Sequence, residues 1–333
     1  MTSTRAVLIL AAALLMAGGL PAEESRRRVI LDTDANNELD DQHAIAYLLF
    51  DAGTWRVEGI TTNRTLGGGD IDAQSAEAER VVRLCGWWGA VAVKKGASGS
   101  FAEIRPHLRE ADHDGHDAVD FLIERARASA AREKLQVIAT GKLTNVALAL
   151  EKDPAIADRI RVLWLGSNWP YDATEYNEKS DPGAVNAVFD GTVELDVALV
   201  RYGVRGSKAG TAAVTVTQDE IAARMPGQGP RVAPVVGRHG GAFTCFGDYS
   251  VDLFKHVKDR ERALFDVAGV AIAKNPALAK GEAVPAPRLE GKRWRARPSN
   301  ARRVRMFSAP QREAILADFF RVIEAYGLPS NPP

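Results

Sequence analysis

The sequence has few cysteines and no net charge. Cys85 and Cys245 are its only cysteines, which are too few for a framework of disulfides. We expect two unpaired, buried thiols, because free cysteine is among the most buried residue types, with one bridge between them as the alternative. The 43 Lys and Arg residues balance 43 Asp and Glu residues, so no overall field draws the chain to nucleic acid or to an anionic membrane.

Long apolar runs are also absent, except at the N-terminus. Arg5 precedes the run VLILAAALLMAGGL at 7–20, and small residues then lead to charged ones. This order is typical of a Sec-type signal peptide, and the run is shorter than the roughly 20 residues of a membrane-spanning helix. A buried N-terminal helix is the alternative. We expect a signal peptide at 1–22, a single domain at 23–333, and a secreted or periplasmic protein with no membrane partner.

Beyond this segment, short β-rich runs alternate with stretches that carry apolar residues at helical spacing. The predicted strands are 28–32, 55–62, 91–93, 135–140, 160–166 and 193–200, and the predicted helices are 40–50, 72–85, 117–131, 144–151 and 183–189. Apolar strands separated by helices favour a parallel sheet that is buried on both faces. We therefore expect an α/β fold, with a doubly wound, mostly parallel central sheet and helices on both faces. Glycine- and proline-rich stretches at 67–69 and 225–241 are predicted loops.

A basic run lies near the C-terminus. Seven Lys and Arg residues stand between Lys292 and Arg305, with Trp294 among them. A nucleic-acid-binding patch is one interpretation. We favour a solvated hairpin and loop at 286–305, because most charge runs are solvated surface, and we expect no nucleic-acid partner.

An acidic stretch follows the first predicted strand. The sequence VILDTDANNELDD at 29–41 crowds five acids into ten positions, at Asp32, Asp34, Glu38, Asp40 and Asp41. Like charges at such distances repel unless a cation or an arginine compensates them. Ligands of open α/β sheets bind where loops leave the carboxyl ends of strands, which is where this stretch lies. The stretch therefore predicts a binding site for a positively charged group.

The kind of metal follows from the residue types. The stretch begins like an EF-hand loop, but Asn37 replaces the glycine of the sharp turn and His43 replaces the closing glutamate. A carboxylate-rich site without cysteine or a nearby pair of histidines favours a hard cation, Ca²⁺ before Mg²⁺, over zinc. Further oxygen ligands are expected from ATGKLTN at 139–145, from GSNWPYDATEYN at 166–177, and from Asp266 at a helix start.

In content and order, these motifs resemble the inosine–uridine-preferring nucleoside hydrolases. The family's aspartate motif is usually DTDPGxDD and here reads DTDANNELDD, with two extra residues between Asp34 and Asp40. GITT at 59–62, ATGKLTN, WLGSN…EYN and Asp266 before VAGVAI follow it in the family's order. The resemblance covers nearly the whole mature chain. It implies hydrolysis of N-glycosidic bonds in ribonucleosides or related ribosides, a bound Ca²⁺ and a homodimer or homotetramer.

The resemblance also implies roles for individual residues. Asp34 is implied as the general base that takes a proton from the attacking water. The implied metal ligands are Asp34, Asp41, the Thr140 carbonyl and Asp266. The implied substrate-binding residues are Asp40, Asn63, Asn168, Glu175 and Asn177. Asn63 stands earlier after GITT than the family's asparagine does.

One departure concerns the leaving group. In many family members, the residue before the last aspartate is a histidine that helps to protonate a purine leaving group. This chain has Phe265 at that position. His239, in the sequence GRHGG, is our candidate for the general acid, against the alternative of a solvated loop histidine. His113 and His116 are weaker candidates for the edge of the pocket. Two other functions stay open, a calcium-dependent sugar- or nucleoside-binding protein without catalysis and a hydrolase of a different glycoside.

Overall fold

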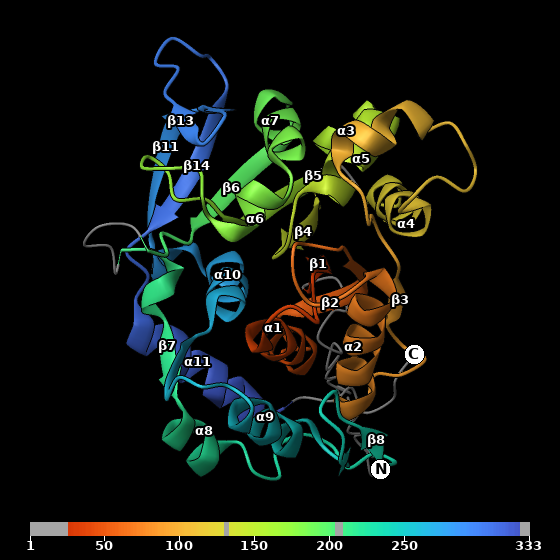
Figure 1. Ribbon diagram of the computed structural model, residues 1–333, viewed down its shortest axis with the longest axis vertical. Coiled ribbons are helices and arrows are strands. Elements are labelled where there is room, and N and C mark those ends of the chain that lie inside the picture. The colour runs from red at the N-terminus through yellow and green to blue at the C-terminus, as the bar shows by residue number, and fades with distance from the viewer. Residues whose placement is uncertain (1–25, 130–132, 204–208, 327–333) are drawn as a thin grey trace, which may run out of the picture.

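The computed structural model describes residues 26–129, 133–203 and 209–326, and the predicted signal peptide at 1–22 lies outside them. The centre of the fold is an eight-stranded sheet with the order β11-β14-β6-β5-β4-β1-β2-β3 (Figure 1). Its strands are β1 Arg27–Thr33, β2 Trp55–Thr62, β3 Ala92–Lys94, β4 Leu135–Ala139, β5 Ile160–Gly166, β6 Glu194–Leu199, β11 Lys280–Pro285 and β14 Arg303–Ser308. All neighbouring strands are parallel except β11, which runs antiparallel to β14 at the edge. The prediction of a mostly parallel sheet is confirmed.

Helices cover both faces of the sheet (Figure 1). The core on one face contains residues of α1 Leu39–Phe50, α2 Ile71–Leu84, α8 Gln218–Arg224, α9 Phe246–Lys255, α10 Phe265–Lys274 and α11 Arg312–Glu324. The other face packs on α3 Phe101–Ile104, α4 His116–Arg127, α5 Thr144–Lys152 and α7 Pro182–Asp190. Successive strand residues point to opposite faces, so Val29 and Leu31 lie in the first core and Ile30 lies in the second. Burial on both faces explains why these strands read as continuous apolar runs.

Shorter elements complete the fold. They are α6 Tyr176–Ser180, the two-stranded pairs β7 Thr215–Thr217 with β10 Glu261–Ala263, β8 Val235–Val236 with β9 Ala242–Phe243, and β12 Arg288–Glu290 with β13 Arg293–Arg295, and 3-10 turns at Arg105–His107, Pro154–Asp158, Thr211–Ala213 and Pro276–Leu278. The predicted hairpin in the basic run is confirmed as β12 and β13, although Trp294 is buried rather than solvated. Cys85 and Cys245 are both free and buried, as expected. Among the described residues, no helix has the length and apolar character needed to cross a bilayer.

The chain order of the strands creates the site. β1 lies between β2 and β4, so the loops that leave β1 and β4 turn toward opposite faces of the sheet. A crevice opens at the carboxyl ends of strands where the order reverses in this way. The acidic stretch follows β1 directly, and Thr140 follows β4.

Candidate active site

A cleft of about 410 Å³ lies at this end of the sheet. Most of the predicted site residues line it, namely Asp34, Asp40, Asp41, Thr140, Glu175, Asn177 and Asp266. Phe265, Tyr176, Tyr202, Lys179, Glu38 and Arg262 also line it. The structure therefore brings together residues that the sequence separates by more than two hundred positions.

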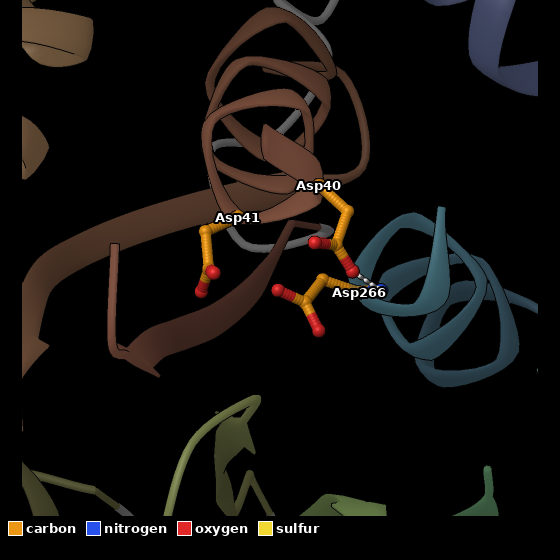
Figure 2. Close-up of side chains that lie close together, drawn as sticks. All are labelled: Asp40, Asp41 and Asp266. Atoms are coloured by element: carbon orange, nitrogen blue, oxygen red, sulfur yellow. Dashed lines mark hydrogen bonds between the residues drawn. The ribbon is translucent and has the colours of Figure 1, made fainter. Parts of the chain in front are cut away.

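Three aspartates form the centre of the cleft. Asp40 and Asp41 lie in the first turn of α1 and Asp266 lies in the first turn of α10, and the three side chains face one another (Figure 2). One carboxylate oxygen from each residue lies within 4.8 Å of the others. The Asp266 backbone N–H also donates to Asp40 Oδ2 at 3.3 Å. Acids are stabilised at helix N-termini, so the two helices help to hold this charge in place.

Hydroxyl groups orient two of the carboxylates. The Thr33 hydroxyl donates to Asp41 Oδ1, and the Thr65 hydroxyl donates to Asp34 Oδ2. Gly141 makes room for Asp34, because a Cβ atom at this position would lie 3.0 Å from Asp34 Oδ1 and 2.6 Å from Asn63 Oδ1. The glycine of ATGKLTN is therefore required for steric reasons. The contact of Thr65 with Asp34 was not indicated by the sequence motifs.

Burial controls the charge of these acids. It raises the pKa of Asp34 and of Asp40 to about 7, with neighbouring carboxylates adding to the effect. It also raises the pKa of Asp41 and of Asp266 well above the ordinary value. A cation among these groups would favour their ionised forms and lower their pKa values.

The donor set fits a hard divalent cation. It consists of carboxylate oxygens with the Thr140 carbonyl beside them, and the lining residues that the structure describes include no cysteine or histidine. Such oxygen-only sites suit Ca²⁺ or Mg²⁺ rather than zinc. The carboxylates that the structure gathers closely enough to share an ion are Asp40, Asp41 and Asp266. The resemblance implied Asp34, Asp41, Thr140 and Asp266 instead, and that ligand set stays a prediction.

Asp32 has a different role from the other acids of the stretch. Its Oδ1 accepts from Thr61 Oγ1 and from Asn145 Nδ2, each at 2.7 Å, and its Oδ2 accepts from Asn63 Nδ2 at 3.3 Å. The Asn63 carbonyl oxygen accepts the Lys142 backbone N–H at 3.3 Å. Asn63 lies outside the cleft lining and ties β1 to the loop after β4, so its predicted contact with substrate has no support in this geometry.

The other side of the cleft presents Glu175 and Asn177. Glu175 caps α6 and accepts from the backbone N–H groups of Ser167, Asn177 and Glu178 at 2.9–3.0 Å. Asn177 Nδ2 donates to the Thr140 carbonyl at 2.7 Å and to the Leu165 carbonyl at 3.0 Å.

Asn168 does not line the cleft. Its amide nitrogen donates to Asp172 Oδ1 at 3.1 Å and to the Tyr202 carbonyl at 3.4 Å, and its Oδ1 is buried without a hydrogen-bond partner among the described residues. The predicted contact of Asn168 with substrate therefore stays a prediction.

Similarity to known proteins identifies the family of this chain. A model of the family described as inosine-uridine preferring nucleoside hydrolases matches residues 29–309. The chain belongs to this family. The similar probable uridine nucleosidase 2 of Oryza sativa subsp. japonica is 29% identical over 203 residues, which are 53% of this chain and 56% of that protein. Non-specific ribonucleoside hydrolase RihC of Salmonella agona is 32% identical over 190 residues, which are 50% and 58%. The chain thus spans little more than half the length of these relatives.

Solved structures share the fold. A plant nucleoside hydrolase superposes with a TM-score of 0.69 at 19% identity, covering 90% of this chain and 99% of its own. A purine-preferring ribonucleoside hydrolase from Gardnerella vaginalis gives 0.69 at 18% identity, with the same coverage. At these identities the likeness shows the nucleoside hydrolase fold alone.

The residues implied for the general acid depart from the expected pattern. Phe265 lines the cleft, with its ring 6.0 Å from that of Tyr202. His239 does not line the cleft as the structure describes it; it is exposed and stacks on His256 with ring centroids 4.0 Å apart. The general-acid role of His239 thus stays a prediction that its position does not support. His113 and His116 also lie outside the lining, and His113 Nε2 is 3.2 Å from Lys152 Nζ.

Two residues of the lengthened motif, Asn37 and Glu38, line the cleft and contact other lining residues. Asn37 Oδ1 accepts from the Tyr176 hydroxyl at 3.1 Å, and Glu38 pairs with Arg262. These contacts tie the lengthened segment between Asp34 and Asp40 to α6 and to β10. Neither pairing was predictable from the sequence, because the partners lie far apart along the chain.

Proposed function

We propose that this protein is a calcium-dependent hydrolase of the N-glycosidic bond in ribonucleosides or related ribosides. The observation that supports this most directly is the shared cleft, which contains the cluster of Asp40, Asp41 and Asp266 opposite Glu175 and Asn177. Family membership supports the same reaction. The substrate is a small molecule, and the sugar is the part that the cleft is equipped to hold.

Asp34, Asp41, the Thr140 carbonyl and Asp266 are proposed to hold the Ca²⁺ ion. When bound, such an ion lowers the pKa of a water molecule and orients sugar hydroxyl groups. Asn177 supports this arrangement, because its amide fixes the Thr140 carbonyl.

Asp34 is proposed to remove the proton from the attacking water. The Thr65 hydroxyl engages one of its oxygens, so the carboxylate is held in one orientation. Its burial keeps the pKa near neutrality in the cation-free protein, and a cation lowers it, so the base is ionised at neutral pH.

Asp40, Glu175 and Asn177 are proposed to bind the ribose hydroxyl groups. Cleavage of a glycosidic bond passes through an oxocarbenium-like state with positive charge on the sugar. Buried carboxylates fixed around the sugar stabilise that charge without reorganising at the moment of reaction. The electron pair of the broken bond leaves with the nucleobase or other leaving group, and the water adds its hydroxyl to the sugar carbon.

The test is a panel of purine and pyrimidine ribonucleosides assayed by reducing-sugar release, with Ca²⁺ and with EDTA. We expect turnover of at least one riboside that EDTA abolishes and Ca²⁺ restores. Binding without sugar release would favour the non-catalytic sugar- or nucleoside-binding protein. Release only from ribosides with other leaving groups would favour a hydrolase of a different glycoside, a candidate that Phe265 in the cleft supports.

We further propose a secreted or periplasmic homo-oligomer, a dimer or a tetramer. The order of Arg5, the apolar run and the following small residues supports export. N-terminal sequencing of the exported protein should find a mature start near Glu23, and light scattering should give the oligomeric state. Retention of residue 1 in the exported protein, or a monomer, would contradict these proposals.

A further inference from the structure

Several arginines in the basic run and beside it have carboxylate partners within the protein. Arg288 and Arg297 both pair with Asp190, the second at 2.6 Å. Arg305 pairs with Asp196 at 2.5 Å. Arginines paired in this way are poorly placed to bind phosphates. The role of the hairpin β12–β13 therefore has to follow from the contacts that it makes within the protein.

Trp294 is the buried centre of that hairpin. It lies in β13, whose flanking residues are exposed, while its own side chain is 8% exposed. Its ring contacts Phe189 and Trp169, with centroids 5.3 Å and 5.9 Å away. Its indole N–H donates to Glu178 Oε2 at 2.9 Å. The hairpin thus presents one hydrogen-bond donor to the short helix α6.

Glu178 passes this contact on to Glu175. Glu178 Oε1 accepts the Glu175 backbone N–H at 3.1 Å, and the Glu178 backbone N–H donates to Glu175 Oε2 at 2.9 Å. The hairpin holds the preceding loop as well, because the Ala173 N–H donates to the Lys292 carbonyl at 3.1 Å. Burial and the neighbouring Glu175 carboxylate raise the pKa of Glu178 to about 8, and the hydrogen bond from the Trp294 indole opposes this rise.

We infer that Trp294 is a positioning residue for the sugar side of the cleft, which acts through Glu178 to fix the backbone and the carboxylate of Glu175. This inference rests on the proposed function, in which Glu175 binds the ribose hydroxyls. Trp294 itself is not among the lining residues, so its role is to position other groups rather than to bind the substrate. Its contribution is geometric, since small displacements of a group that stabilises the transition state are costly.

The test compares Trp294→Phe with Trp87→Phe in the calcium-loaded full protein. The first variant keeps an aromatic ring but removes the indole donor. The second loses the same atoms from a side chain that is also 8% exposed, but whose indole nitrogen has no hydrogen-bond partner among the described residues. On the best riboside of the panel, we expect Trp294→Phe to lower kcat about tenfold with KM nearly unchanged, as loss of one hydrogen bond in the transition state implies. Trp87→Phe should leave kcat within about twofold.

A double-mutant cycle identifies the route through Glu178. Glu178→Gln should cost less activity in the Trp294→Phe background than in the wild type, because the indole no longer requires an acceptor there. Equal costs in both backgrounds would overturn the proposed route.

Hydrogen exchange gives a measurement that is independent of turnover. The Ser167 and Asn177 amides donate to the Glu175 carboxylate, so Trp294→Phe should speed their exchange and Trp87→Phe should not. If the wild type hydrolyses no riboside, the proposed function fails while this exchange still tests the positioning. Unchanged exchange in Trp294→Phe, faster exchange without loss of kcat, or equal loss of kcat in both tryptophan variants would overturn the inference.

Discussion

The acid cluster predicts a specific dependence of stability on pH and calcium. In the metal-free protein, burial raises the pKa of Asp34 from 3.8 to about 7. A raised folded-state pKa means that the stabilising contribution is complete below the unfolded value and is lost as the pH rises through the folded value. The metal-free protein should therefore lose stability between about pH 4 and pH 7.

The size of the effect follows from that rise in pKa. At 1.36 kcal/mol per pKa unit, one such carboxyl destabilises the metal-free protein by about 4 kcal/mol above pH 7. The free-energy change is counted for one carboxyl only, because the pKa values of strongly interacting acids belong to the cluster as a whole and do not add residue by residue. A protein of this size changes its Tm by roughly 2 °C for each kcal/mol, so the loss corresponds to roughly 8 °C.

Calcium should reverse this loss. A ligand that binds only the folded state at a thousand times its Kd stabilises it by about 4 kcal/mol. Protonated carboxyls do not bind the ion, so the rise in Tm on adding Ca²⁺ should be small at pH 5 and largest near pH 8. Differential scanning calorimetry from pH 5 to pH 8, in EDTA and in excess Ca²⁺, measures both effects.

Asp41→Asn separates the ion from other causes. This variant keeps an acceptor for the Thr33 hydroxyl but removes one negative charge from the cluster. We expect it to have a higher Tm than the wild type in EDTA at pH 8, and no response to Ca²⁺. Asp72→Asn, at an exposed position, is the control and should respond to Ca²⁺ like the wild type. A full Ca²⁺ response in Asp41→Asn, or equal stability of the metal-free wild type at pH 5 and pH 8, would refute the reasoning.

Three further predictions concern single contacts. Thr65→Val removes a hydrogen bond that lowers the pKa of Asp34, so the acidic limb of the kcat/KM profile should move to higher pH; an unmoved limb would exclude Asp34 as the titrating base. Asn177→Ala should weaken Ca²⁺ binding in titration calorimetry as well as sugar contacts, because its amide fixes the Thr140 carbonyl, and unchanged Ca²⁺ affinity would argue against that carbonyl as a ligand. His239→Ala should leave the ratio of purine nucleoside to p-nitrophenyl riboside turnover unchanged, whereas selective loss of purine turnover would restore His239 as the acid.

The parallel centre of the fold was predictable from the sequence because burial on both faces leaves a strong apolar signal. All six predicted strands and all five predicted helices correspond to elements of the structure. β14 was missed because Arg303 and Arg305 interrupt its apolar residues. The structure explains the second arginine, which binds Asp196 on the neighbouring β6. The charge of Arg305 is compensated by a partner that the local sequence does not show.

The candidate site was predictable to the extent that its residues follow strand ends. The acidic motif, Thr140 and Asp266 could be placed by the rule for carboxyl ends of strands and by the resemblance of motifs. The contacts that hold them could not be predicted. Asn177 and Thr140 are 37 positions apart, and Trp294 and Glu178 are 116 apart. Such pairs depend on tertiary packing, and no spacing pattern in the sequence indicates which residues will be partners.

The instability of the acid cluster and its proposed chemistry have one physical origin. Carboxylates held together by burial repel one another until positive charge arrives, and both a cation and an oxocarbenium-like sugar supply that charge to the same cleft. A site prepared in this way does not reorganise during the reaction, but it destabilises the protein when it is empty of cations. Asp41→Asn should therefore gain stability in EDTA and lose riboside hydrolysis together. If the two effects separated, with stability gained and hydrolysis kept, the crowding of acids would serve the fold rather than the reaction.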